Sequence, residues 1–148
     1  MNIYPEWWDT SITIYNRVDD PQTNVIRWYK HTIDGAFWKY IKDKVTVGET
    51  VIETNKIICR IRKDDNYMDK AEWLALPNDK KESYFTLGQK DIIIKGAVDD
   101  EIDEYVKGHR STDIIAKYKA LQGCMEVDRA ADNTGGGRGQ EHYVAEGI

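Results

Sequence analysis

The sequence predicts a single domain of the α+β class, mainly β, built as a small β-barrel or sandwich with two short helices and a C-terminal hairpin. Most of the chain alternates apolar and polar residues with a period of two, which is typical of strands with one buried face. Two short segments show helical spacing and capping residues instead. The 148 residues, 41% of them hydrophobic, suffice for one core and are too few for two comfortable domains.

Segments with strand periodicity fill the first half of the chain. In 55–62, Ile57, Cys59 and Ile61 share one face, so we expect Cys59 to be a buried free thiol. Asp34-Gly35 predicts a turn or a bulge, and Gly48 interrupts the weakest segment. The expected strands cover residues 11–17, 23–31, 33–41 and 55–62, with a weaker one at 45–52.

Two segments predict helices. Asp69 and Glu72 have the spacing of a capping box, so we expect a helix over 70–76 that Pro77 ends. The second helix is expected over 113–122, capped by Ser111 or Thr112 and stopped by a glycine. Its buried face is predicted to contain Ile114, Ile115, Tyr118 and Leu121.

The densest β signal, Ile92-Ile93-Ile94, is followed by a run of acidic residues. Three consecutive isoleucines bounded by glycines indicate a strand that is buried on both faces. The carboxylates after it form either a solvated face or a wall that repels phosphate. This acidic run, residues 99–104, contains Asp99, Asp100, Glu101, Asp103 and Glu104.

Both ends of the chain contain candidate contact segments. Residues 1–10 form an N-terminal arm, whose aromatic side chains fold back over the domain's own sheet or dock on a neighbouring subunit. The single β-rich domain covers 11–148 and closes with strands at 125–130 and 141–146. Asn133–Gln140 joins these strands as a flexible glycine-rich loop, which lacks the spacing of a phosphate cradle and is expected to contact a partner.

Composition excludes several classes of protein. A net charge of −5 argues against gripping a phosphate backbone through a broad basic face. No apolar run approaches the roughly 20 residues of a membrane helix, so we expect no membrane association. The start lacks the features of a signal peptide, so we expect synthesis in the cytoplasm. We expect no catalytic, cofactor or metal site, although a triad assembled in space from scattered residues stays open.

Five short motifs follow one another along the chain: the opening Ile12-Thr13-Ile14-Tyr15, the Trp28 strand, Cys59-Arg60-Ile61-Arg62, Ile92–Gly96 and His142-Tyr143-Val144. In this order they resemble the small head–tail connector proteins of tailed bacteriophages, of the head-closure or adaptor type. The closing segment is similar to the last hairpin of head–tail joining, minor capsid-like proteins of phages of Gram-positive hosts. The two predicted helices are additions to the minimal connector barrel.

The resemblance implies a structural virion protein, not an enzyme, made in the host cytoplasm and located at the head–tail interface. Identical subunits would form a ring between portal or adaptor and tail proteins, with double-stranded DNA passing through its lumen without sequence-specific binding. A tail-terminator or baseplate protein, or a small enzyme or ligand-binding domain, is the alternative. The candidate interface residues are Trp7, Trp8, Gly135, Gly136, Gly137 and Arg138, and the candidate channel-facing residues are Asp99, Asp100 and Glu101.

Overall fold

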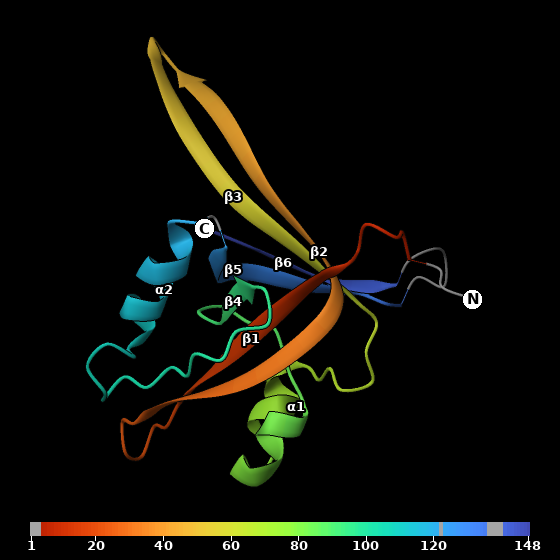
Figure 1. Ribbon diagram of the computed structural model, residues 1–148, viewed down its shortest axis with the longest axis vertical. Coiled ribbons are helices and arrows are strands. Elements are labelled where there is room, and N and C mark those ends of the chain that lie inside the picture. The colour runs from red at the N-terminus through yellow and green to blue at the C-terminus, as the bar shows by residue number, and fades with distance from the viewer. Residues whose placement is uncertain (1–3, 122, 136–140) are drawn as a thin grey trace.

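A closed antiparallel barrel forms the body of the molecule (Figure 1), seen in a computed structural model that describes residues 4–121, 123–135 and 141–148. The predicted class is confirmed, and of the two predicted architectures the barrel is the one observed. It closes because β4 pairs with β1. Around the barrel the strands are β1 (Thr10–Asp19), β2 (Ile26–Val47), β3 (Thr50–Arg62), β6 (His142–Gly147), β5 (Cys124–Asn133) and β4 (Ile92–Lys95).

The barrel interior is filled by the inward side of these strands. Ile57, Cys59 and Ile61 are buried as their alternation predicts, and Ile12 and Ile14 meet them from β1. Burial raises the pKa of the Cys59 thiol above its ordinary value. Cys59 is therefore an inert core residue, as the sequence predicts.

β2 is one continuous strand of 22 residues, where the sequence predicted two. Of the turn or bulge predicted at Asp34-Gly35, the bulge is observed: Thr10 pairs with Ala36, whereas Ile12 pairs with Ile33, so one residue is added on β2. Gly35 has a φ of +78°, which glycine adopts without strain. The prediction of separate strands over 23–31 and 33–41 was wrong because Thr32 pairs with Thr13 and the strand continues while pairing passes from β1 to β3.

β4 is buried on both faces, as the isoleucine run predicts. Ile93 lies inside the barrel with the residues of β1, whereas Ile92 and Ile94 lie on its outer surface. There they are covered by Ile114 of α2 (Ser111–Lys119) and by Ile102 from the acidic run. The acidic run is therefore attached to the barrel through its own apolar residues.

Helix α2 differs from its prediction at both ends. It begins at Ser111 with Arg110 as the N-cap, and the Arg110 backbone N–H donates to Asp113 Oδ2 over 3.2 Å. Asp113, rather than a hydroxyl group of Ser111 or Thr112, thus caps the helix. Leu121 lies beyond the helix end and is 78% exposed, so its predicted place on the buried face was wrong.

Helix α1 (Lys70–Leu74) and the 3-10 helix η1 (Asn78–Ser83) lie below the barrel in Figure 1. Asp69 occupies the N-cap position without a side-chain hydrogen bond, so the predicted capping box does not form. Trp73 is fully buried, and its indole N–H donates to the carbonyl oxygens of Lys81 and Tyr84 at 3.2 Å each. Among the described residues, no helix is long and apolar enough to cross a membrane.

Asp91 is a buried carboxylate that ties three segments together. Its Oδ1 accepts hydrogen bonds from the Arg17 backbone N–H (2.9 Å) and Lys70 Nζ (3.1 Å). Its Oδ2 accepts from Asn16 Nδ2 and the Gly88 backbone N–H, both at 2.9 Å. Burial raises the pKa of Asp91, and the Lys70 ammonium and these donors act against that rise. The network fixes the chain before β4 against β1 and α1.

Candidate assembly surfaces

The most prominent surface is the outer part of the β2–β3 hairpin, which projects from the barrel along the long axis of the molecule (Figure 1). We call residues 42–55 the ribbon. Its two strands stay in register from Lys42 opposite Asn55 to Val47 opposite Thr50. Gly48 and Glu49 form the two-residue turn, with Gly48 at a φ of +64°, which the tight hairpin turns require.

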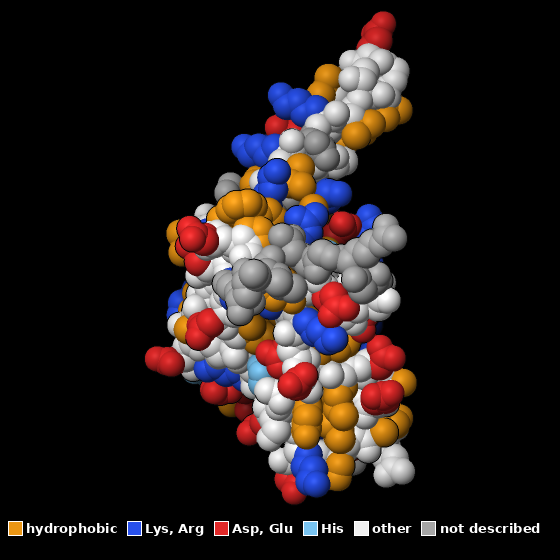
Figure 2. All heavy atoms as spheres, turned by 90° about the vertical axis from the view of Figure 1, so that its right-hand side faces the viewer, with side chains coloured by type: hydrophobic (Ala, Val, Ile, Leu, Met, Phe, Trp, Pro, Cys, Tyr) orange, Lys and Arg blue, Asp and Glu red, His pale blue; other side chains and the backbone are white. Residues whose placement is uncertain are grey.

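The ribbon exposes large β-branched side chains near its tip. Val47 and Val51 are 58% and 60% exposed, and Val45 and Ile52 are exposed almost as strongly. Val45, Val47 and Ile52 share one face because cross-strand partners lie on the same side, whereas Val51 is on the other. Figure 2 shows hydrophobic side chains on the ribbon and lysine or arginine side chains around its base.

The ribbon was not predicted from the sequence. The segment 45–52 was predicted as one weak strand that a glycine interrupts, whereas Gly48 and Glu49 are the turn between two strands. The available signal was the apolar residue at alternate positions on both sides of this Gly-Glu pair. Gly-X is one of the dipeptides that two-residue hairpin loops use, so the segment held a hairpin signal.

The acidic run is held against the barrel by specific contacts. The Tyr15 hydroxyl donates to the Asp100 carbonyl oxygen over 2.6 Å. The Asp100 carboxylate accepts hydrogen bonds from the Tyr118 hydroxyl and from Lys117 Nζ, the latter at 3.2 Å. The Tyr118 hydrogen bond, together with Lys117, lowers the pKa of Asp100 below its ordinary value. Asp100 thus anchors the run to α2.

The remaining carboxylates of the run are divided between internal contacts and solvent. Glu104 Oε1 accepts from the Trp28 indole N–H at 3.0 Å and from the Ser111 backbone N–H at 3.1 Å. Glu101 is 74% exposed and lies 3.6 Å from Lys30 Nζ. Asp99 is exposed. Of the three candidate channel-facing residues, Asp99 and Glu101 therefore point to solvent, whereas Asp100 serves the fold.

A hollow of about 410 Å³ lies between the acidic run and the start of β2. The Tyr105 hydroxyl at its edge accepts a hydrogen bond from the Ile26 backbone N–H over 3.0 Å. Its lining combines apolar and aromatic side chains with the charged Arg27 and Asp103, and its surface is more polar than apolar. The residues that line it are Val25, Ile26, Arg27, Trp28, Tyr29, Ile102, Asp103 and Tyr105.

The N-terminal arm folds back over its own domain. Trp8 is buried, its ring lies 6.1 Å from that of Phe37, and its carbonyl oxygen accepts from Arg62 Nη2 over 2.8 Å. Tyr4 stacks on Trp8 with ring centroids 5.4 Å apart. Trp7, by contrast, is 67% exposed. Of the two arm tryptophans proposed for an interface, only Trp7 is accessible in this structure.

The glycine-rich loop begins where β5 ends. Gly135 is exposed and lies two residues after Asn133, the last residue of β5. Gly136, Gly137 and Arg138 lie outside the described residues, so their predicted partner contacts stay predictions. The flanking strands pair from Asn133 opposite His142 to Val127 opposite Gly147, which confirms the predicted C-terminal hairpin.

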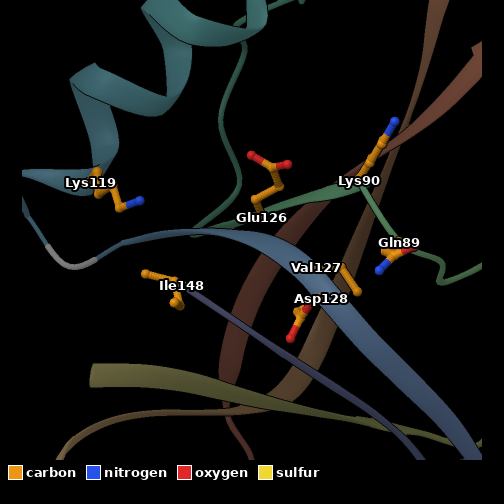
Figure 3. A pocket seen from close by; sticks show the side chains of 7 residues that line it. All are labelled: Gln89, Lys90, Lys119, Glu126, Val127, Asp128 and Ile148. Carbon is orange, nitrogen blue, oxygen red and sulfur yellow. The ribbon is translucent and has the colours of Figure 1, made fainter. Parts of the chain in front are cut away.

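Another hollow, of about 500 Å³, lies beside β5 (Figure 3). Lys90 and Lys119 line it from opposite sides of the view, and Glu126 and Asp128 supply two carboxylates. The opposite charges balance, and the side chains come from separate segments. Within the part of the chain that the structure describes, no group of three or more His, Cys, Asp or Glu could hold a metal ion.

The chain matches the model of a family described as "Family of unknown function (DUF6751)" over residues 7–147. The chain belongs to this family. The matched residues include the barrel, the ribbon and the acidic run, so these features all lie within the family's domain. No curated protein and no solved structure matches the chain.

Proposed function

We propose that this DUF6751 member is a structural virion protein that forms a ring in the head–tail connector of a tailed bacteriophage, around the DNA channel. The observation that carries the proposal is the ribbon, a two-stranded extension of a closed barrel with exposed valines and isoleucine near its tip. The sequence resemblance to connector proteins supplies the biological setting, in which the ring joins portal or adaptor to tail proteins.

The ribbon supports assembly because contacts with its own domain stabilise it little. A two-stranded hairpin is marginally stable alone in water. Residues 44–54 are all exposed, so no part of the barrel covers them. Exposed β-branched side chains on unpaired strand edges favour contact with another chain. A neighbouring subunit would bury these side chains and order the ribbon.

The charge of the chain supports a DNA channel. A net charge of −5 disfavours tight binding of the phosphate backbone, and DNA has to slide through a connector without sticking. Exposed carboxylates such as Asp99 and Glu101 would repel phosphates wherever they face the lumen. The protein is then located in the virion, after synthesis in the host cytoplasm.

The experiment is deletion of the gene in the phage that encodes the chain, followed by complementation. We expect DNA-filled heads and unattached tails in electron micrographs, with the chain present in purified wild-type particles. A variant in which Asp43–Thr54 is replaced by Asn-Gly should fold yet fail to complement, because it lacks the ribbon tip but keeps the barrel.

The matched control for this variant is Leu74→Ala, which removes a 45% exposed side chain from α1 and leaves the ribbon intact. It should complement fully. Infectious particles from the gene deletion, or particles that lack the chain, would contradict the proposed function.

A further inference from the structure

We propose that the ribbon of one copy docks on the acidic run of a second copy, with its apolar tip in the hollow between that run and β2. This rests on the proposed ring and names the two surfaces that would join its subunits. The occupant of the hollow is thus a second copy of this chain.

The tip has the chemistry of a buried contact. Val45, Val47 and Ile52 form an apolar face, each about half exposed, with Val51 behind them. Aliphatic burial contributes roughly 25 cal/mol per Å² of apolar area removed from water, so covering these side chains favours association. Because they are β-branched and set on paired strands, they lose little rotamer freedom on docking.

The hollow is a suitable receptor for such a tip. Its volume of about 410 Å³ is within the roughly 300–1,000 Å³ of typical binding pockets. Val25, Ile26 and Trp28 supply half-buried apolar side chains to its lining, beside the exposed Arg27, and Tyr105 is 62% exposed at the edge. Val106, the next residue, is also 45% exposed, so the apolar surface continues beyond the hollow.

Charge sets the orientation of the contact. The base of the ribbon, residues 39–44 and 53–60, contains five lysines and arginines against Asp43 and Glu53. The acidic run has five carboxylates within residues 99–104 and no cation.

Lys44 lies four residues behind Gly48, so at about 3.3 Å per residue it reaches about 13 Å back from the tip. Lys42 and Lys44 lie on the face of the ribbon opposite to Val45, Val47 and Ile52, because successive side chains of a strand alternate, and Glu53 is the cross-strand partner of Lys44. With the tip between the acidic run and β2 of the neighbour, the apolar face would therefore meet β2 and the lysines would lie along the run.

The positions of the two surfaces fit a head-to-tail assembly. In Figure 1 the ribbon occupies one end of the long axis, whereas the β1–β2 turn and the acidic run lie toward the other end and side. Two different, complementary surfaces on each subunit give a heterologous contact, which closes into a ring when the rotation per subunit allows it. A ribbon that docked on its own hollow is excluded by this separation.

Cross-linking of paired cysteines tests the contact in purified protein and in purified particles. Val47→Cys with Val106→Cys places one thiol at the tip and one two residues beyond the acidic run, next to Tyr105 of the hollow, while the native Cys59 and Cys124 are buried. We expect a short bismaleimide to give covalent dimers and larger species. The control pair, Val47→Cys with Leu74→Cys, has a second thiol site of equal exposure and should give at least about tenfold less product.

A product yield equal in both pairs, or no intermolecular product in either sample, would overturn the inference. If particles contain the chain but give no cross-link between positions 47 and 106, the proposed contact is contradicted and the proposed function is not. Absence of the chain from particles would remove the proposed function, whatever the purified protein does.

Charge reversal tests the electrostatic part of the contact, between the ribbon lysines and the acidic run. Lys42→Glu with Lys44→Glu should weaken self-association at least about tenfold in sedimentation, because like charges would then face each other. Adding Glu101→Lys and Asp103→Lys should restore it. Lys80→Glu with Lys95→Glu changes the net charge equally, away from both surfaces, and should have no effect. If the acidic-run changes alter DNA retention but not self-association, the run faces DNA and the inference fails.

Discussion

The barrel and the ribbon share strands β2 and β3, yet the side chains of these strands meet opposite environments in the two parts. Ile57, Cys59 and Ile61 of β3 are buried, whereas every residue from Lys44 to Thr54 is exposed. The alternation of apolar residues is similar in both parts. The difference is that the barrel strands have a partner on each side and a shared interior, which the ribbon lacks. A β pattern alone therefore does not distinguish core strands from an exposed ribbon.

This comparison predicts that stability resides in the barrel and assembly in the ribbon. Substitutions in the barrel should lower the free energy of unfolding strongly. Substitutions in the ribbon should leave that free energy nearly unchanged and weaken assembly instead.

The largest effect is expected for Asp91→Ala. It leaves the backbone N–H groups of Arg17 and Gly88 without their acceptor. It also removes one of the two acceptors of the Asn16 amide, which keeps the Thr86 carbonyl oxygen. Losing a buried, hydrogen-bonded charge partner costs about 3–5 kcal/mol. Urea denaturation measures this loss. Asp65→Ala, at an exposed carboxylate, should stay within about 0.5 kcal/mol, and equal losses in the two variants would refute the assignment.

Ile93→Ala should follow, with a loss of about 2–5 kcal/mol, because Ile93 is fully buried inside the barrel and its truncation leaves a cavity. The matched ribbon variant, Val51→Ala, removes an apolar group that is 60% exposed and should change the free energy of unfolding by less than about 0.5 kcal/mol. Thermal or urea unfolding of both proteins tests the contrast. A similar loss in both would mean that the ribbon is part of the cooperative core.

Asp100→Asn should have a smaller effect that depends on pH. The folded-state pKa of Asp100 is lowered, so its carboxylate stabilises the folded state above its ordinary pKa of about 4. That contribution is lost as the pH falls through the lowered folded-state pKa. The gap in unfolding free energy between wild type and variant should therefore be full at neutral pH and shrink below about pH 4. A gap that is constant with pH would show that the Tyr118 and Lys117 contacts do not depend on the charge.

The smallest effect on folding is expected for Val47→Thr at the ribbon tip. Thr keeps the β-branched shape at a site that is 58% exposed, so the free energy of unfolding should change by less than about 0.5 kcal/mol. The added hydroxyl would be buried in the docked state, and self-association should weaken. Sedimentation of wild type and variant measures this, with Thr46→Val as the reciprocal control on the opposite face. Unchanged association would show that the tip is not in the contact.

Much of the barrel could be predicted from the sequence because burial leaves a local pattern. Alternation places Ile57, Cys59 and Ile61 on one face, and the isoleucine run indicates a strand covered on both sides. The acidic run was also apparent as a segment. Its division into the anchor Asp100 and the exposed Glu101 was not, because that division depends on Tyr15 and Tyr118, which are distant in sequence.

The ribbon and the bulge could not be predicted with the same certainty. Gly35 and Gly48 give equal local signals, yet Gly35 continues a strand while Gly48 turns the chain. Which occurs depends on whether a third segment pairs across the glycine, as β1 does at Gly35. Likewise, nothing near Trp7 and Trp8 indicates which of them is buried, because Trp8 is covered by Phe37 and His142 from elsewhere.

Because β2 is continuous, it connects the hollow and the ribbon tip within each subunit. The strand starts at the walls of the hollow, with Ile26 and Trp28, and ends at the tip, with Val45 and Val47. In the ring that we propose, a force on the ribbon tip of one subunit would be transmitted along β2 to the hollow of that subunit, where the tip of the previous subunit binds. The bulge at Gly35 interrupts the regular pairing along this strand, so the stiffness of the bulge would set how far a displacement at one contact spreads around the ring.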